Sequence, residues 1–372
     1  MPYSDYVHIT TFAHGNTYLS STIQNPASTS IDSLSYLSFE DALWEFLAQK
    51  VPLGSTLLFP DFFCTDVWDN CRAHGYTVET YPVTEDLTIK QEHFWSAVKR
   101  YNPAVVFVFH TFGIQNSLLS SDLFARYSGW VIEDSVHRII EPTRLTLLDE
   151  RHIVIDSTRK LTPLLGSQIF ARKNVLTYTS HLSNSDPESH HHTTQKILAF
   201  WKQFQDLLAS ADFAQVTQAY ELLNSGDNLI GDSMESLGLD HHFLEQRKYL
   251  DMDTIHQAKQ QHYSLYETRL ESILKDERFV ISWKRETAHK GDRFDGSDLA
   301  FYPLILHSDY AFLLKEYLLK RQIQTFVEFS DSPWAINKNI ICLPLGPHVT
   351  SDQIELACHC ILEWFGDRST LA

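Results

Sequence analysis

Two polar residues that directly follow apolar runs are the best candidates for chemistry in this sequence. Asp134 ends the run V-I-E-D, and Lys160 follows the run V-I-D-S-T-R between two apolar segments. In an open α/β sheet, ligands bind at the carboxyl ends of strands, so a carboxylate and an amine at two such ends can face one ligand. Taken alone, each residue has an ordinary interpretation, because Asp134 can cap a turn and Lys160 can extend from a strand end into solvent. Together they suggest a site at the edge of a sheet.

The elements that must position these two residues alternate between strand and helix. Short apolar runs indicate strands, and apolar residues at spacings of three and four indicate helices between them. The expected strands are Leu57–Pro60, Thr77–Val83, Ala104–Phe109, Trp130–Ile132, His152–Ile155 and Gln168–Ala171. The expected helices are Phe39–Gln49, Thr65–His74, Gln91–Arg100 and Ser121–Tyr127. This alternation predicts βαβ units, and therefore an α/β fold with a mostly parallel sheet covered on both faces.

The pattern changes in the second half of the chain. The polar stretch 183–192 is predicted to be a loop, and Gln195–Leu208 and Thr254–Leu274 are predicted to be long helices. The elements expected after about residue 277 are strands Phe279–Trp283, Leu299–Leu306, Gln324–Glu328 and Asn339–Leu343, with helices Tyr310–Lys320 and Ser351–Trp364. We therefore expect two domains: a large α/β domain over residues 1–250, and a small α+β domain over residues 251–372 that includes a linking helix.

Composition and charge narrow the class of protein. The chain has 372 residues, of which 43% are hydrophobic, and this supports a folded interior. Its formal net charge of −17 disfavours binding to nucleic acids and to anionic membrane surfaces. The five cysteines include no C-x-x-C pair, which indicates a reducing compartment. Neither a signal peptide nor an apolar run of about 20 residues is visible, so we expect a cytoplasmic protein.

Motifs of several other classes are absent or weak. The sequence contains no G-x-G-x-x-G, no G-x-x-x-x-G-K-[ST] and no G-x-S-x-G, which disfavours dinucleotide, P-loop and α/β-hydrolase chemistry. The triplet His190–His192 and the pair His241 and His242 lack the spacing that places ligands on one helix face. Cys358 and Cys360 are interpreted as ordinary helix residues. We expect no metal site.

The order of several short motifs resembles one known family. A strand ending in E-D-x-x-[HQ], followed later by a lysine in S-x-R-K, is similar to the fold-type-I enzymes that use pyridoxal 5'-phosphate (PLP). The closest resemblance is to the DegT/DnrJ/EryC1/StrS sugar aminotransferases, in the divergent branch that carries S-L-R-K. Further matches are S-F-E-D-A-L (38–43), L-F-P-D-F-F-C (58–64), H-T-F-G (110–113) and I-C-L-P-L-G-P (341–347). Each motif is short, but their order extends the resemblance over most of the chain.

The resemblance implies an activity and a role for three residues. Lys160 would form a Schiff base with PLP and move the proton between substrate and cofactor. Asp134 would keep the ring nitrogen protonated, so that the ring acts as an electron sink. His137 would lie near the phenolic oxygen of the ring. The implied enzyme is a homodimeric aminotransferase of sugar biosynthesis that moves an amino group from glutamate to a keto (nucleotide-)sugar or a related small keto acceptor.

The resemblance also implies how the phosphate and the ring are held. Ser157 and the backbone amides at Phe39 and Glu40 would hold the phosphate, because the N-terminus of a helix carries unpaired N–H groups and positive partial charge. Phe63 or Cys64 would face the ring, and the sequence leaves these two alternatives open.

The sequence departs from the family pattern at the phosphate site. Family members usually have Gly at the position of Phe39, and a carboxylate at Glu40 repels a phosphate unless it points to solvent. Arg159 is expected to point away from the site, because successive extended residues face opposite sides. Two alternatives to the aminotransferase therefore remain: a degenerate member without PLP that acts as a binding or scaffold protein, and a PLP enzyme of another reaction type. The retention of both Asp134 and Lys160 favours the aminotransferase.

Overall fold

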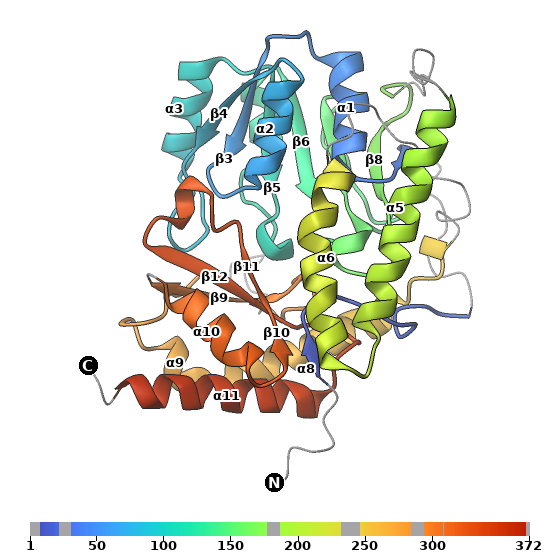
Figure 1. Cartoon of the computed structure of the whole chain (residues 1–372). Helices are drawn as coiled ribbons and strands as arrows, with labels where there is room; N and C mark the ends of the chain where they lie inside the picture. The colour runs from blue at the N-terminus through green and yellow to red at the C-terminus, as the bar shows by residue number, and fades with distance from the viewer. Residues whose placement is uncertain are drawn as a thin grey trace.

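A seven-stranded sheet forms the centre of the larger lobe (Figure 1). The computed structural model describes residues 8–21, 31–176, 187–231, 246–283, 294–307 and 309–369. In order across the sheet, the strands are β2 (Ile31–Tyr36), β8 (Ser167–Arg172), β7 (His152–Asp156), β6 (Trp130–Ser135), β5 (Val105–Phe109), β3 (Thr56–Pro60) and β4 (Thr77–Tyr81). The strands from β7 to β4 run parallel, and β8 is antiparallel to both of its neighbours. The predicted α/β fold with a mostly parallel sheet is confirmed.

Helices cover both faces of this sheet. They are α1 (Phe39–Lys50), α2 (Thr65–Ala73), α3 (Gln91–Tyr101) and α4 (Ser121–Arg126). Phe107 of β5 lies in a core that includes residues of α1 and α2, whereas its neighbours Val106 and Val108 lie in a second core with residues of α3 and α4. Successive strand residues point to opposite faces, so a strand that is apolar at every position must be covered twice.

Two long helices pack beside the sheet and against the segments that carry the site. They are α5 (Pro187–Leu208) and α6 (Phe213–Gly231), which lie side by side in Figure 1. Their apolar side chains share a core with Leu37 and Leu165. The indole of Trp201 in α5 donates a hydrogen bond to the carbonyl oxygen of Pro163 (2.9 Å). These contacts hold both the start of α1 and the turn after β7.

The smaller lobe is an antiparallel sheet packed on helices. Its strands are β9 (Tyr302–His307), β11 (Phe326–Glu328) and β12 (Lys338–Leu343), in the order β11-β12-β9. Its helices are α8 (Met252–Arg269), α9 (Glu271–Leu274), α10 (Tyr310–Leu319) and α11 (Ser351–Ser369). The N-terminal strand β1 (Ile9–Thr10) pairs in parallel with β10 (Ile323–Gln324). A segment near the start of the chain is therefore bound to the smaller lobe, in the lower part of Figure 1.

The two lobes meet at Gly113 with no space for a side chain. Its φ of 91° lies in the left-handed region, and an added Cβ would stand 2.0 Å from the backbone oxygen of Asp298. The adjoining amide of Ala300 donates to the oxygen of Phe112 at 2.8 Å. Only glycine permits both this conformation and this close approach. The motif H-T-F-G therefore forms part of the contact between the two lobes.

The structure corrects several expectations from the sequence. The segment Phe279–Trp283 is not a strand, because only Val280 forms a bridge, to Leu306 of β9. Residues 187–192 begin α5 rather than a loop, and proline is well suited to a first helical position. Residues 183–186 and the pair His241 and His242 lie outside the described residues.

Other boundaries also differ. The predicted helix Thr254–Leu274 is divided at Leu270 into α8 and α9. The predicted strand Gln324–Glu328 is divided into β10 and β11. The edge strand β2 and the helix α6 were not predicted. β2 reads I-D-S-L-S-Y and is only partly buried, so its apolar pattern is weak.

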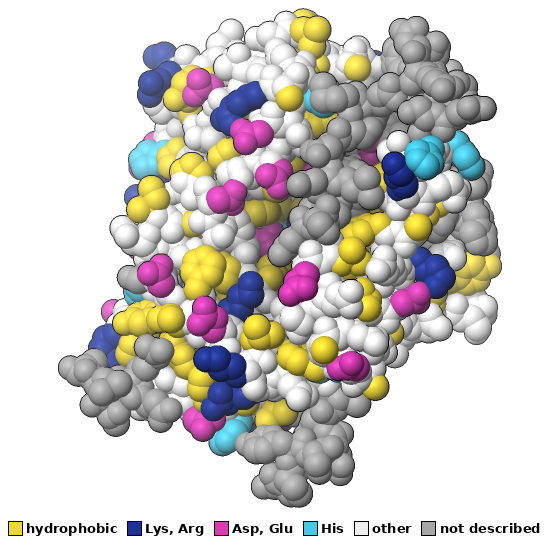
Figure 2. Space-filling model, viewed as in Figure 1, with side chains coloured by type: hydrophobic (Ala, Val, Ile, Leu, Met, Phe, Trp, Pro, Cys, Tyr) yellow, Lys and Arg dark blue, Asp and Glu magenta, His cyan; other side chains and the backbone are white. Residues whose placement is uncertain are grey.

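The surface of the described part carries charges of both signs. In the view of Figure 2, Lys and Arg side chains are scattered among Asp and Glu, and the described residues of this face form no continuous basic patch. Among the described helices, none is long and apolar enough to cross a membrane.

Candidate functional site

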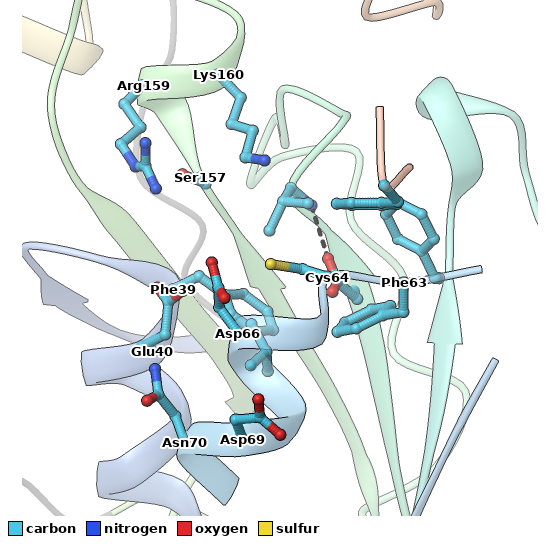
Figure 3. A pocket seen from close by; sticks show the side chains of 15 residues that line it. Phe39, Glu40, Phe63, Cys64, Asp66, Asp69, Asn70, Ser157, Arg159 and Lys160 are labelled. Atoms are coloured by element: carbon cyan, nitrogen blue, oxygen red, sulfur yellow. Dashed lines mark hydrogen bonds between the residues drawn. The ribbon is translucent and has the colours of Figure 1, made fainter. Parts of the chain in front are cut away.

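One pocket at the carboxyl edge of the large sheet gathers most of the predicted site residues (Figure 3). Seven of the eight line it: Phe39, Glu40, Phe63, Cys64, Asp134, Ser157 and Lys160. They come from the starts of α1 and α2, the end of β6 and the turn after β7. The eighth, His137, is fully buried beside the pocket and is not among its lining residues. The residues predicted from the sequence therefore lie together at one edge of the sheet.

The turn that carries Lys160 is closed by its own hydrogen bonds. Thr158 donates to the carbonyl oxygen of Gly166 through both its amide (2.9 Å) and its hydroxyl (2.8 Å). Thr162 donates back to the oxygen of Thr158 through its amide (2.9 Å) and hydroxyl (3.0 Å). Residues Thr158–Lys160 form a short 3₁₀ helix. Lys160 is therefore held in a rigid turn between β7 and β8.

Arg159 was expected to point away from the site, and this expectation is wrong. A 3₁₀ turn rotates successive side chains by about 120°, whereas an extended chain alternates them by about 180°. Arg159 and Lys160 therefore both line the pocket. Figure 3 shows the two side chains reaching into it from the same turn.

A buried ion pair supports the strand that leads into this turn. Asp156 ends β7, and its carboxylate accepts two hydrogen bonds from the guanidinium of Arg247, one of them at 3.1 Å. The same carboxylate accepts from the amide of Gln168 in β8 (2.9 Å). A bidentate pair of this kind fixes orientation as well as charge. Arg247 was not identified from the sequence, since nothing in its local pattern indicates a partner so far away.

Asp134 is a buried carboxyl with few partners. It is 1% exposed, and its Oδ1 accepts one hydrogen bond, from the amide of Val136 (3.0 Å). Burial raises the pKa of Asp134 to about 7; the Val136 amide and the Lys160 ammonium oppose this rise, and the carboxylates of Glu40 and Glu133 add to it. A carboxyl with these surroundings is stabilised as an anion only when a cation approaches it.

Glu328 of β11 faces Lys160 and was missed by the sequence. Its Oε1 lies 3.9 Å from Lys160 Nζ and 3.6 Å from Nε2 of His137. Burial raises the pKa of Glu328, but Lys160 and His137 more than offset this, so the pKa lies below its ordinary value. Glu328 therefore carries a negative charge at neutral pH. A charged residue within the apolar run T-F-V-E-F was the available signal.

The two candidates for the residue facing a ring both line the pocket, and their side chains lie differently in it. Phe63 packs its own ring among Phe59 and Phe109, with centroids 5.1 and 5.4 Å away. In Figure 3, the sulfur of Cys64 points into the pocket below Lys160. Burial raises the pKa of the Cys64 thiol to about 12, so the thiol is neutral. Both residues line the pocket, and the Cys64 thiol points into it below Lys160.

The start of α1 offers hydrogen-bond donors to the pocket. Ser38 caps the helix: its hydroxyl accepts from the amide of Asp41 (3.0 Å) and donates to the carboxylate of Asp41 (2.7 Å). This cap leaves the first amides of α1, at Phe39 and Glu40, directed toward the pocket end of the helix. Ser157 lines the same pocket from the turn after β7.

The pocket is richer in acidic side chains than the sequence indicated. Asp66 and Asp69, on the first turn and the middle of α2, line it together with Glu40. Figure 3 shows Arg159 on the opposite side of the pocket from these carboxylates. Among the described residues, no group of three or more His, Cys, Asp or Glu side chains is arranged to hold a metal ion.

Comparisons with known proteins show which solved structures have a similar fold. No family model and no curated protein matches the sequence. Among solved structures, the chain is similar to a DegT DnrJ EryC1 StrS aminotransferase from Brucella abortus, with a TM-score of 0.57 and 14% identity over 89% of this chain and 85% of that one. It is also similar to PseC of Helicobacter pylori, an aminotransferase involved in the biosynthesis of pseudoaminic acid (TM-score 0.57, 13% identity, covering 90% and 87%).

A third similar structure contains a cofactor. NtdA of Bacillus subtilis, solved with bound pyridoxamine phosphate (PMP), has a TM-score of 0.56 and 13% identity over 89% of this chain and 72% of that one. At these identities the comparisons speak for the fold. The chain therefore has the fold of the PLP-dependent aminotransferases of fold type I, and its resemblance to the DegT/DnrJ/EryC1/StrS group is confirmed at the level of that fold.

Proposed function

We propose that the protein is a PLP-dependent aminotransferase in which Lys160 is the catalytic lysine. One observation carries this proposal: the amine of Lys160 and the buried carboxyl of Asp134 line the same pocket of this fold. Either residue alone has a structural interpretation. The two in one pocket point to a ligand, because a buried carboxyl with a single hydrogen-bond donor lowers the stability of the fold unless a cation completes it.

The residues of the pocket fit the parts of PLP. Asp134 offers an anion with a pKa of about 7 for a protonated ring nitrogen. The start of α1 and Ser157 offer donors for a phosphate, and Arg159 supplies the positive charge that offsets Glu40 and Asp66. Cys64, the residue that precedes α2, faces the ring. We assign His137 a position near the ring's phenolic oxygen, since its ring lies beside the pocket wall at Phe109 (5.2 Å between centroids).

When bound, PLP supplies an electron sink for a carbanion next to nitrogen. The residues of the chain supply binding, orientation and proton transfer. Lys160 takes the proton from the substrate carbon and returns it, because its amine is the basic group inside the pocket. Glu328 lies 3.9 Å from that amine and offers it a negative counter-charge. The neutral thiol of Cys64 adds no charge beside the ring.

A second cavity of about 390 Å³ adjoins Lys160 and offers room for the acceptor. It shares Arg159, Lys160 and Glu328 with the neighbourhood of the first pocket, and aromatic side chains form much of its wall, among them Phe12, Trp201, Tyr220 and Phe326. Aromatic faces and a few charged groups suit a sugar or nucleotide-linked ring. We propose glutamate as the donor, a keto sugar or related small keto compound as the acceptor, and a homodimer as the working form.

The test is the covalent state of Lys160. Purified protein mixed with PLP is reduced with borohydride, digested and analysed by mass spectrometry. We expect the mass of the cofactor on Lys160 in the wild type and no cofactor adduct in Lys160→Ala. The matched control is Lys173→Ala, at an exposed lysine directly after β8, which should keep the adduct on Lys160. Addition of glutamate before reduction should decrease the adduct, because the amino group is transferred. A wild-type protein without the adduct would contradict the proposal.

The acid-rich lining of the pocket favours one competing function. Glu40, Asp66 and Asp69 face a space in which a phosphate must fit, which supports a degenerate member that binds another ligand. A protein that stays colourless with PLP and shows no thermal shift would favour this second function over the first. A PLP adduct on Lys160 without amino transfer would instead indicate a PLP enzyme of another reaction type.

A further inference from the structure

A third cavity, here called the back cavity, lies on the other face of β6 from Asp134. It measures about 500 Å³ and is lined by Glu133 of β6, by the segment 138–148 and by α8. Its wall mixes charged groups with apolar side chains such as Ile139, Leu145 and Met252. None of the residues proposed to hold PLP lines it. The back cavity is therefore separate from the site already described.

Lys259 is the unusual residue of this cavity. The residue is 3% exposed yet lines the cavity from α8. Among the residues that the structure describes, none forms an ion pair or hydrogen bond with its ammonium group. Burial lowers the pKa of Lys259 to about 8, and the more distant carboxylate of Asp298 opposes this only in part. A buried ammonium without a partner destabilises a fold unless a ligand or an acceptor completes it.

The other charged groups around the cavity are already paired or lie in solvent. Arg144 lies 3.1 Å from the carboxylate of Glu141, and Arg138 lies 3.9 Å from that of Glu133. Asp298 is exposed.

His256, on the same face of α8 as Lys259, adds no second positive charge. Burial and the Lys259 ammonium lower the pKa of His256, while Asp298 and Glu141 raise it in part, so the imidazole is neutral at pH 7. Lys259 is therefore the one cation of the described cavity wall without a close counter-ion.

We propose that the back cavity is a second binding site, which takes a small organic carboxylate with an apolar body and pairs its carboxylate with Lys259. A carboxylate matches one ammonium in charge, whereas a phosphate dianion needs several donors to be desolvated. The apolar part of the ligand would replace water against Ile139, Leu145 and Met252. The proposal does not depend on PLP, because no residue is shared with the catalytic pocket.

The experiment uses benzoate as the probe and benzamide as its uncharged isostere, with the full-length protein loaded with PLP. Isothermal titration should show saturable binding of benzoate in the millimolar range, about 4 kcal/mol of binding free energy. Benzamide should bind at least tenfold more weakly. Lys259→Met should weaken benzoate binding at least tenfold, and Lys160→Ala should leave it unchanged. Equal binding to the wild type and Lys259→Met, or no saturable binding by the wild type, would overturn the proposal.

A second measurement needs no variant at Lys259. Trinitrobenzenesulfonate is an aromatic anion that reacts with an unprotonated amine. The amine nitrogen forms a bond to the aromatic ring, and sulfite leaves with the electrons of the broken carbon–sulfur bond. The nitrogen then loses a proton to solvent. At pH 8, peptide mass analysis should find Lys259 labelled faster than the exposed Lys173, and benzoate but not benzamide should slow this labelling at least fivefold. Labelling of Lys259 that is slower than that of Lys173, or indifferent to benzoate, would indicate a hydrated cavity without a ligand.

Discussion

Glu133 and Asp134 are neighbours on β6, both buried, yet their surroundings differ completely. Nε2 of His110 lies 2.9 Å from one oxygen of Glu133, and Nε2 of His152 donates to the other at 2.9 Å. The hydroxyl of Ser135 adds a third contact at 3.0 Å. Burial alone would raise the pKa of Glu133, but the two histidines outweigh it and hold the pKa well below its ordinary value. Asp134, one residue later, has a pKa raised to about 7.

This difference separates a structural carboxylate from a functional one. The backbone of a strand turns successive side chains to opposite faces, so two adjacent acids reach two unrelated environments. On the face of Glu133, the chain supplies every partner. On the face of Asp134, it supplies one amide and leaves an opening where the pocket lies. A buried charge that the fold does not satisfy indicates where a ligand belongs.

The largest expected effect follows from removing the charge of Asp134. Asp134→Asn should lower kcat/KM at least about 100-fold, roughly 3 kcal/mol of transition-state stabilisation, because a neutral amide does not hold the ring nitrogen protonated. At neutral pH the folded variant should be at least as stable as the wild type, since the carboxyl has a single hydrogen-bond donor and its burial disfavours the charged form. Steady-state kinetics and denaturant unfolding measure the two quantities. Asp69→Asn, at the same pocket, is the control and should change kcat/KM less than about twofold. Activity of Asp134→Asn within threefold of wild type would contradict this role.

Glu133→Gln should have the opposite outcome. We expect a loss of about 3 kcal/mol in the free energy of unfolding, because His110 and His152 lose a buried anionic partner. Activity per folded molecule should persist. Since the pKa of Glu133 lies below its ordinary value of 4.5, its contribution is present above that pH and is lost as pH falls. The stability difference from wild type should therefore shrink in acid.

The exposed pair of Lys202 and Asp206 on α5 provides the control for that variant. Asp206→Asn should cost less than about 0.5 kcal/mol, because exposed pairs contribute little. A Glu133→Gln protein as stable as Asp206→Asn would show that the histidines do not depend on the carboxylate.

A pH series on the cofactor-free protein tests the contrast between the raised pKa of Asp134 and the lowered pKa of Glu133. The pKa of Asp134 is raised from an ordinary 3.8 to about 7, so between these values the folded state retains a proton that the unfolded state releases. Stability from this group is thus full below about pH 4 and declines as pH rises to about 7. Denaturant unfolding should show wild type losing stability relative to Asp134→Asn across this window. Parallel curves would contradict the raised pKa.

The smallest effect is expected at Glu40. Glu40→Gln should strengthen PLP binding about fivefold, roughly 1 kcal/mol, because it removes a carboxylate from the side of the pocket assigned to phosphate. Quenching of tryptophan fluorescence measures the affinity. Glu92→Gln, at an exposed position of α3, should leave the affinity unchanged. A weaker affinity in Glu40→Gln would mean that Glu40 instead holds Arg159 in place.

The sequence predicted the sheet and its edge better than the details of the pocket. A run such as V-V-F-V-F is apolar at every position, which fits a strand buried on both faces of a sheet. β5 and its neighbours could therefore be predicted. Asp134 and Lys160 were found because each interrupts such a run. Glu328 and Arg247 were missed, because their partners Lys160 and Asp156 lie 168 and 91 residues away in sequence. Arg159 was misplaced because a 3₁₀ turn replaced the assumed extended backbone.

The pairing of β1 with β10 has a consequence for synthesis of the chain. Ile9 pairs with Ile323 and Thr10 with Gln324, while the hydroxyl of Tyr220 lies 2.8 Å from that of Thr10. At about 5–20 residues per second, a ribosome takes on the order of 15–60 seconds to reach the partner strand. During that interval the large sheet can form, but the N-terminal strand has no partner. The pairing that ties the N-terminal strand to the smaller lobe can therefore form only after β10 has been synthesised.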